Sequence, residues 1–258
     1  MGVGVGVSEA IWTRVSDLGQ SNPRSRDRLL LMAKPKTKVG QAPALSRALW
    51  EEWLQWLLKS RGPRMMVVVK LTGCFGLRAG EAVALKREDI VLHGGVPKIC
   101  VTGETAGARK SPGEVYIRLK DLGFVKLLLT KGITGKHTRG HKHGKRLSGG
   151  GRRRTIEKLE TYRAPKTGYL FTARKNAAQK HLSYHAVYLA VRQEAPKFFE
   201  HLKKEGRLVP EVAKLRPHSG RAQLITELMG DGLSTAMSMK YARHAVGSVK
   251  VHLKYSRL

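Results

Sequence analysis

The chain of 258 residues carries 49 Lys and Arg against 19 Asp and Glu. This formal net charge of +30 makes a compact chain repel itself unless a polyanion such as nucleic acid neutralises it. The chain has two cysteines, Cys74 and Cys100, which excludes a disulfide framework and a four-cysteine zinc site, so we expect an intracellular protein. No run approaches the ~20 apolar residues of a membrane span, so we expect no membrane partner.

Two regions are predicted. Residues 1–43 are rich in Gly, Ser, Lys and Arg and indicate a basic, low-complexity N-terminal arm. Residues 44–258 form the predicted folded domain, in which Ser46 is a plausible N-cap for a helix. Hydrophobic residues follow it at helical spacing, and its tryptophan stripe (Trp50, Trp53, Trp56) favours a core face over a base-stacking platform.

The next elements are a buried segment, a helix and a hairpin. Residues 65–71 are apolar and β-branched, and periodicity does not separate helix from strand there. Residues 77–85 indicate a helix. Strand-like runs at 98–102 and 114–119 flank a Gly-rich turn with Arg109 and Lys110, which predicts a β-hairpin with a basic tip.

Residues 131–154 carry nine Lys or Arg, seven Gly and no acidic residue, which predicts a flexible basic loop. His137, His141 and His143 could be metal ligands, but no Cys or carboxylate accompanies them in this segment. A solvated, phosphate-seeking loop is therefore favoured, and no metal is expected. With the hairpin tip, it supplies the predicted DNA-binding side chains: Arg109, Lys136, Arg139, Lys142, Lys145, Arg146, Arg152, Arg153 and Arg154.

Helices are then expected at residues 181–194, 198–204 and 222–229. Together with the hairpin they predict a fold that is mainly α-helical with a small antiparallel β-sheet.

Two Arg-containing motifs could bind a phosphodiester. Arg78 opens a helix after a Gly-flanked turn, and Glu81, three residues later, can fix its rotamer while the guanidinium offers a bidentate fork. The alternative is a surface Arg–Glu pair. His218 and Arg221 stand at a helix start, where the positive end of the helix dipole suits a phosphorane that gains negative charge.

The C-terminal stretch offers a nucleophile. His244 precedes Tyr255 by eleven residues. A tyrosine with a pKa of about 10 needs neighbouring cations to react at neutral pH. The alternative reading is that Tyr255 only docks the tail.

In this order, the motifs resemble the tyrosine recombinase (phage integrase) family over roughly residues 45–255. The stretch LTGCFGLRAGEAVALKREDI is similar to its first box, and YLFTARKNAAQKHLSYHAVYLAVRQ to a later segment. The resemblance implies a tyrosine recombinase catalytic-domain fold. Family members normally carry a separate helical core-binding domain as well, so either the arm substitutes for it or the chain is a fragment or degenerate element. The resemblance also implies a catalytic set, with Glu81 supporting the first box: Arg78, Lys110, His218, Arg221, His244 and Tyr255.

The resemblance further implies cofactor-free, metal-independent cutting and rejoining of double-stranded DNA by a tetramer on paired sites. Tyr255 would attack the phosphate, the arginines would bind its oxygens and Lys110 would protonate the leaving oxygen. Because the family usually spaces the tyrosine closer to the histidine, Tyr241 is the alternative nucleophile. The alternative functions are a type IB topoisomerase-like relaxing enzyme, a non-catalytic DNA-binding remnant and a basic RNA-binding protein.

Overall fold

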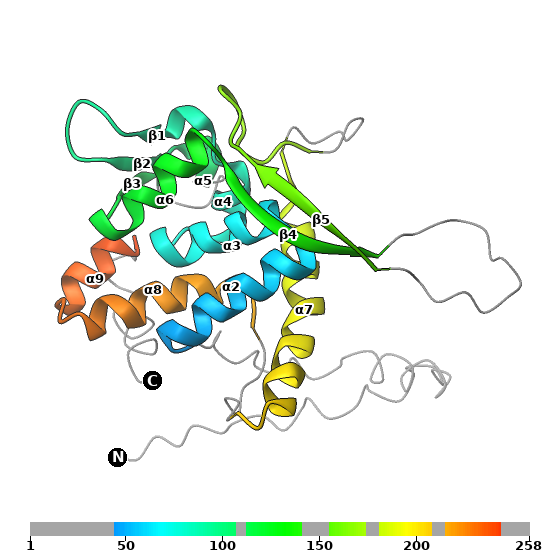
Figure 1. Cartoon of the computed structure of the whole chain (residues 1–258). Coiled ribbons are helices and arrows are strands. Elements are labelled where there is room, and N and C mark those ends of the chain that lie inside the picture. Colours follow the sequence, from blue (N-terminus) through cyan, green and yellow to red (C-terminus); the bar gives the residue numbers. More distant parts are fainter. Residues whose placement is uncertain (1–43, 107–111, 141–154, 174–180, 208–214, 244–258) are drawn as a thin grey trace, which may run out of the picture. The chain divides into compact units, whose positions relative to one another are not determined.

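The computed structural model describes residues 44–106, 112–140, 155–173, 181–207 and 215–243 (Figure 1). These residues are mainly helical, with two small antiparallel sheets, as the sequence predicts. The helices longer than one turn are α2 (Arg47–Arg61), α3 (Pro63–Phe75), α4 (Ala79–Ala84), α6 (Leu119–Leu129), α7 (Tyr184–Lys204), α8 (Ser219–Gly230) and α9 (Thr235–Tyr241).

Helix α2 begins where the sequence predicts it. The Ser46 side chain accepts a hydrogen bond from the Leu49 amide at 3.3 Å, as an N-cap does. Trp50 and Trp53 are buried, and the Trp53 ring lies 5.4 Å from that of Phe198 on α7. The interpretation of the tryptophan stripe as core is confirmed for these two residues.

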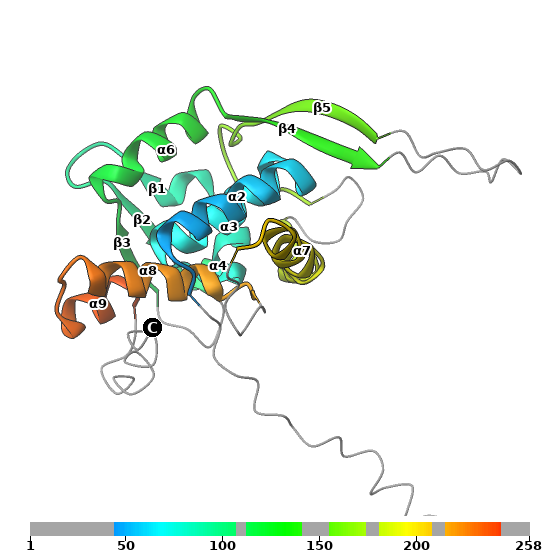
Figure 2. The same ribbon diagram turned by 60° about the horizontal axis from the view of Figure 1, so that its bottom comes forward.

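Helix α3 is the centre of the domain. Residues 65–71, which the sequence left open between helix and strand, lie in this helix. It contacts α2, α4, α7 and α8, and also both strands of the β4–β5 hairpin (Figures 1 and 2). A helix covered on so many sides is apolar around most of its circumference. Because α3 is apolar on most sides, residues 65–71 show no alternation of apolar and polar positions with the period of a helix, which would have identified them as helical.

The first sheet has the order β1–β2–β3, with strands Ile90–Val91, Lys98–Val101 and Gly113–Tyr116. Ile99 pairs with Val115, both buried, so the predicted hairpin of two strands is confirmed. The third strand is shorter than predicted, because α6 begins at Leu119. A short helix, α5 (Gly103–Ala106), lies in the connection, whose residues 107–111 are outside the described ranges.

The predicted loop at 131–154 is wrong for its first part. Strands β4 (Ile133–Gly140) and β5 (Thr155–Tyr162) form a second antiparallel hairpin, a long ribbon in Figure 1. In β4, Gly135 and His137 are buried while Lys136 is exposed, and Gly135 packs against Leu58 of α2. The high Gly and Lys/Arg content concealed this alternation of period two. Residues 141–154 lie outside the described residues.

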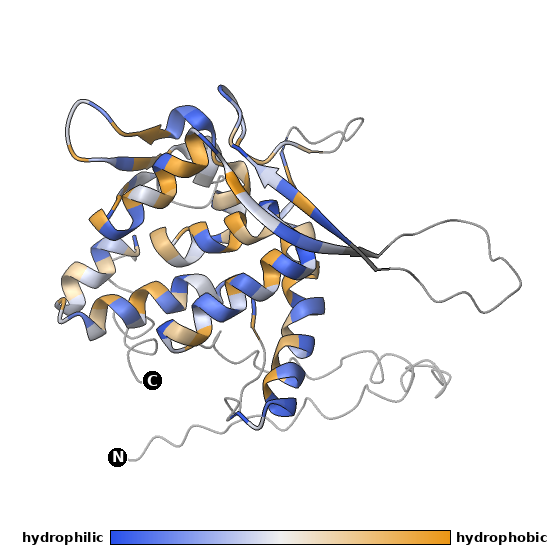
Figure 3. Cartoon of the chain, in the orientation of Figure 1, coloured by the Kyte–Doolittle hydropathy of each residue, from blue (hydrophilic) through white to orange (hydrophobic). Residues whose placement is uncertain are grey.

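The two helices predicted at 181–194 and 198–204 are one helix, α7, which continues through Pro196. Proline removes one helical hydrogen bond and usually breaks a helix. Here the apolar face continues across it, with Val191, Ala195, Phe198 and Phe199 all buried. Figure 3 shows hydrophobic and hydrophilic residues alternating along α7. The packing of this face outweighs the missing hydrogen bond.

Helices α6 and α9 were not expected from the sequence. Helix α6 buries Val125 and Leu128, and α9 is a seven-residue helix that contacts α8. Among the described helices, none has the length and apolar character needed to cross a membrane.

Helices α3 and α8 approach closely at Gly220. A Cβ atom added to Gly220 would lie 2.9 Å from the Gly73 backbone nitrogen and would collide with the Thr72 hydroxyl. This contact sets how near α8, with Arg221, lies to α3.

Gly220→Ala should therefore destabilise the protein by about 1–3 kcal/mol, as overpacking of a well-packed contact does. Urea unfolding followed by circular dichroism measures the change. Gly80→Ala is the matched control, because apart from its two chain neighbours and the backbone of α4 no described atom lies within 4 Å of the point that its new Cβ would occupy. Equal destabilisation of both variants would contradict the close α3–α8 contact.

Candidate active site

Arg78 and Glu81 form the first part of the site. Arg78 is the N-cap of α4, and Glu81 lies in the first turn. The Arg78 Nη1 atom donates to Glu81 Oε1 at 2.7 Å, and the Arg78 backbone amide donates to Glu81 Oε2 at 2.7 Å. The Glu81 side chain is 0% exposed, whereas that of Arg78 is 27% exposed. The surface-pair alternative is therefore wrong, because the carboxylate is buried and orients an accessible guanidinium.

Arg221 enters the same region from α8. It is 3% exposed, and its Nη1 atom donates to the Gly76 carbonyl at 2.5 Å across 145 residues of sequence. Its Nη2 atom donates to the Ala242 carbonyl, just after α9. Gly76 has a φ of 59°, and a Cβ there would lie 2.7 Å from Leu224 of α8. A glycine is required at this turn for both reasons.

Arg243 is a further guanidinium in this region. Its Nη2 atom donates to Glu81 Oε2, so one carboxylate pairs with two arginines, Arg78 and Arg243. The three groups carry a net charge of +1 when ionised. Such a local excess of positive charge favours binding of an anion.

The electrostatics of Glu81 reflect this pairing. Burial would raise the pKa of its carboxyl group, but the charge of Arg243 and the hydrogen bonds and charge of Arg78 outweigh burial. The pKa of Glu81 is therefore held below its ordinary value of 4.5. The carboxylate stays ionised at neutral pH and keeps both arginines in place.

Of the remaining predicted catalytic residues and the alternative nucleophile, some lie in the described part of the chain and others lie outside it. His218 is the N-cap of α8 and is exposed, in contrast to the buried Arg221 one turn later. Tyr241, the alternative nucleophile, is half-buried at the end of α9. Lys110, His244 and Tyr255 lie outside the described residues.

Two of the predicted DNA-binding residues lie in described positions. Lys136 is exposed on β4, and Arg139 belongs to the same strand. The others lie outside the described residues: Arg109, Lys142, Lys145, Arg146, Arg152, Arg153 and Arg154.

Sequence reasoning missed Arg118, which links the start of α6 to α3 and α8. Its guanidinium contacts Asp121 at 2.7 Å, Glu227 of α8 at 3.0 Å and the Cys74 carbonyl of α3 at 3.2 Å. The signal was present as an Arg-x-x-Asp spacing at a helix start, the same as Arg78-x-x-Glu81. Arg243, in contrast, gave no sequence signal, because its partner is 162 residues away.

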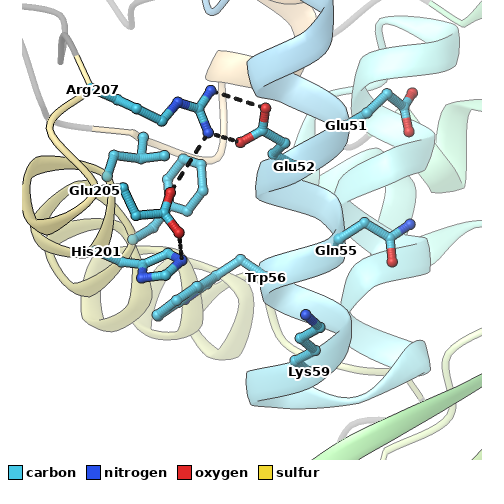
Figure 4. A pocket seen from close by; sticks show the side chains of 10 residues that line it. Glu51, Glu52, Gln55, Trp56, Lys59, His201, Glu205 and Arg207 are labelled. Atoms are coloured by element: carbon cyan, nitrogen blue, oxygen red, sulfur yellow. Dashed lines mark hydrogen bonds and ion pairs between the residues drawn. The ribbon is translucent and has the colours of Figure 1, made fainter.

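A separate surface pocket of about 390 Å³ lies between α2 and the C-terminal part of α7 (Figure 4). There Arg207 reaches the Glu52 carboxylate at 2.5 and 3.0 Å, and His201 lies 3.2 Å from Glu205. None of the predicted catalytic residues lines it. Its carboxylates Glu52 and Glu205 already pair with Arg207 and His201 of the pocket, so the site of interest is the arginine cluster.

Within the described residues, no group of three or more His, Cys, Asp and Glu side chains could hold a metal ion. His137, one of the candidate metal ligands, is buried on β4 with its Nε2 atom 3.3 Å from Glu160 of β5. This contact joins the two strands of the hairpin.

The described part of the chain has the fold of tyrosine recombinase catalytic domains, as the sequence predicts. It is similar to the Tn1549 transposon integrase in complex with transposon right end DNA, at 13% identity, 86% and 63% coverage of the two chains and a TM-score of 0.54. It also matches XerA recombinase at 18% identity, 87% and 62% coverage and a TM-score of 0.49. XerH site-specific recombinase bound to difH substrate matches at 17% identity, 86% and 53% coverage and a TM-score of 0.48.

The chain thus covers between about half and two-thirds of the length of the chains in these three solved structures. No protein-family model and no curated protein sequence matches it. The likeness therefore concerns the fold, and the activity is argued from the site.

Glu81 makes stability depend on pH. Because its folded pKa is lowered, its ionised form stabilises the fold above the ordinary range near 4.5, and this contribution is lost as pH falls through the lowered value. Glu81→Gln should destabilise the protein by about 3 kcal/mol at pH 7, as breaking a buried pair does. The difference from wild type should shrink below pH 4.5.

Chemical unfolding between pH 3 and 7 measures this difference. Glu200→Gln is the control, since Glu200 pairs with Lys204 in an exposed i,i+4 contact that solvent screens. If the free energies of unfolding of wild type and Glu81→Gln differed by the same amount at every pH, Glu81 would not be an ionised carboxylate paired with two arginines.

Proposed function

We propose that this protein cuts and rejoins double-stranded DNA at specific sites through a 3′-phosphotyrosyl intermediate, with Tyr255 as the nucleophile. The observation that carries the proposal is the convergence of two arginines from distant motifs. Arg221 of α8 bonds the Gly76 carbonyl, two residues before Arg78, and Glu81 fixes Arg78. Two guanidinium groups in one region suit the non-bridging oxygens of a phosphate, on which negative charge builds up in the transition state.

The reaction is a transesterification. The Tyr255 hydroxyl oxygen forms a bond to phosphorus, its proton passes to His218, and the bond from phosphorus to the 5′-oxygen breaks. Lys110 gives a proton to that leaving oxygen, because loss of an alkoxide needs a general acid. Attack by a 5′-hydroxyl reverses the steps and releases the tyrosine. The proposal needs no cofactor, since the covalent link conserves the energy of the ester.

In this scheme His244 donates a hydrogen bond to the phosphate, and Glu81 acts through the arginines rather than on the substrate. The exposed position of His218 at the start of α8 supports its assignment, because the start of a helix favours an anion. The proposed active form is a tetramer on paired DNA sites.

The proposed DNA contacts extend beyond the site. The β4–β5 hairpin carries exposed Lys136 and leads into the basic segment at 141–154. A two-stranded β-ribbon can enter the major groove of DNA, and lysine and arginine side chains neutralise its phosphates. We therefore propose that this hairpin contacts DNA outside the cleaved phosphate.

Tyr255→Phe should abolish covalent attachment to a nicked suicide DNA substrate while binding remains. Removing the hydroxyl removes the nucleophile but none of the charges that bind phosphates. Adducts are detected as a shift on a denaturing gel, with substrates drawn from the DNA flanking the coding sequence. Tyr241→Phe is the matched control and should retain the adduct.

An adduct that survives Tyr255→Phe and is lost in Tyr241→Phe would reassign the nucleophile. A wild type that binds these substrates and forms no adduct on any of them would overturn catalysis and indicate a non-catalytic DNA-binding protein.

Arg221→Lys should slow adduct formation by about 10²–10³-fold, the effect of removing one preorganised transition-state donor. Lysine keeps the charge but cannot reach the Gly76 and Ala242 carbonyls with a planar fork. Single-turnover kinetics measure the rate. Arg207→Lys, in the separate pocket, should leave it unchanged; a similar loss in both variants would argue against a specific role.

Lys136→Ala should reduce the slope of log K against log salt by about one, if this side chain neutralises one phosphate. Fluorescence anisotropy on duplex DNA between 50 and 300 mM salt measures the slope. Lys203→Ala, which removes an exposed lysine of α7, should leave it unchanged. Identical slopes for wild type and Lys136→Ala would exclude the hairpin contact at this residue.

A further inference from the structure

Arg243 has a backbone conformation that arginine rarely adopts. Its φ is 48°, and within the described ranges it is the one residue other than glycine with a positive φ. It follows Ala242 directly after α9, where helices commonly end in a left-handed residue, most often glycine. An arginine there is strained relative to the glycine that the position favours.

The Arg243 side chain is also incompletely paired although it is buried. It is 10% exposed, and its Nη2 atom bonds Glu81. Its Nε and Nη1 atoms are buried and have no hydrogen-bond partner within the described part of the chain. Unpaired buried donors and a left-handed backbone both lower stability. Glycine would relieve both penalties but would remove the Arg243–Glu81 ion pair, so this ion pair is what the arginine adds at the position.

The location of the side chain provides an explanation. Through Glu81 it is joined to Arg78 at the start of α4. Its Cδ atom would lie 3.4 Å from a Cβ placed at Gly113, the first residue of β3 and three positions after Lys110.

The backbone beside Arg243 is fixed as well. Arg221 of α8 donates to the carbonyl of Ala242, the residue immediately before it. Arg243 thus lies where α4, β3, α8 and the end of α9 meet, and the chain continues from it into residues 244–255. Among the proposed catalytic residues, Arg78 caps α4, His218 caps α8 and Arg221 lies in α8, while His244 and Tyr255 follow Arg243 in the sequence.

We propose that Arg243 is a positioning residue that ties the end of α9, from which the chain continues to His244 and Tyr255, to the Arg78–Glu81 pair. The proposal rests on the proposed function. Arg243 acts through Glu81 and through the backbone that follows it, and it does not itself contact the phosphate. A glycine would keep the turn but would leave the segment without its ion pair to α4.

The first test compares Arg243→Gly and Arg243→Lys with wild type. Arg243→Gly should slow single-turnover adduct formation at least tenfold. Its DNA affinity should fall no more than that of Arg207→Gly, which also removes one glutamate-paired arginine. Arg243→Lys should recover part of the rate because its ammonium can still pair with Glu81. A merely structural role would instead weaken DNA binding and adduct formation together.

A second measurement does not depend on catalysis. Hydrogen–deuterium exchange of peptides from residues 248–258 should become at least threefold faster in Arg243→Gly and less so in Arg243→Lys. Peptides from α7 should be unchanged. Peptides beyond residue 247 are chosen because they exclude the local effect of the new glycine.

The outcomes separate the two proposals. If wild type forms an adduct and Arg243→Gly forms it at the same rate, the positioning role is wrong and the proposed function stands. If wild type forms none, the proposed function is wrong, and unchanged exchange of residues 248–258 then overturns the positioning role too. Faster exchange without an adduct would retain Arg243 as the anchor of this segment in a non-catalytic protein.

Discussion

Glu81 is a fully buried carboxylate, and a buried charge must be paired. Its two oxygens accept from the Arg78 amide, the Arg78 guanidinium and the Arg243 guanidinium. Removing any of these partners would leave charge in a poorly solvated position, which is strongly unfavourable. The start of α4 and the end of α9 are therefore held together by one side chain, and the rest of the site is arranged around it.

The second constraint is the close contact between α3 and α8. Gly220 allows α8 to approach the backbone of α3, and Gly76 provides the left-handed turn that leads to α4. Arg221 then reaches carbonyls on both sides of this junction. Backbone proximity and guanidinium hydrogen bonds thus act together. The glycines let α8 approach α3, and the hydrogen bonds of Arg221 hold the two helices in that position.

The separation of roles between helices and hairpin follows from burial. The helices enclose the core around α3, whereas the β4–β5 hairpin packs on α2 through one face and leaves Lys136 exposed. A chain with a net charge of +30 needs positions for its cations that cost no burial. Hairpins and connecting segments provide them, and this is where the proposed DNA contacts outside the site concentrate.

Features that depend on short-range pattern could be predicted from the sequence. The N-cap at Ser46, the β2–β3 hairpin and the Arg78-x-x-Glu81 pair follow from spacing of a few residues, and the order of motifs predicted the fold. Tertiary structure decided the rest. The Glu81–Arg243 pair spans 162 residues, α7 continues through Pro196 because its apolar face is packed, and β4 forms because Gly135 lies against Leu58. These features arise from contacts between distant segments, and local propensity does not encode such contacts.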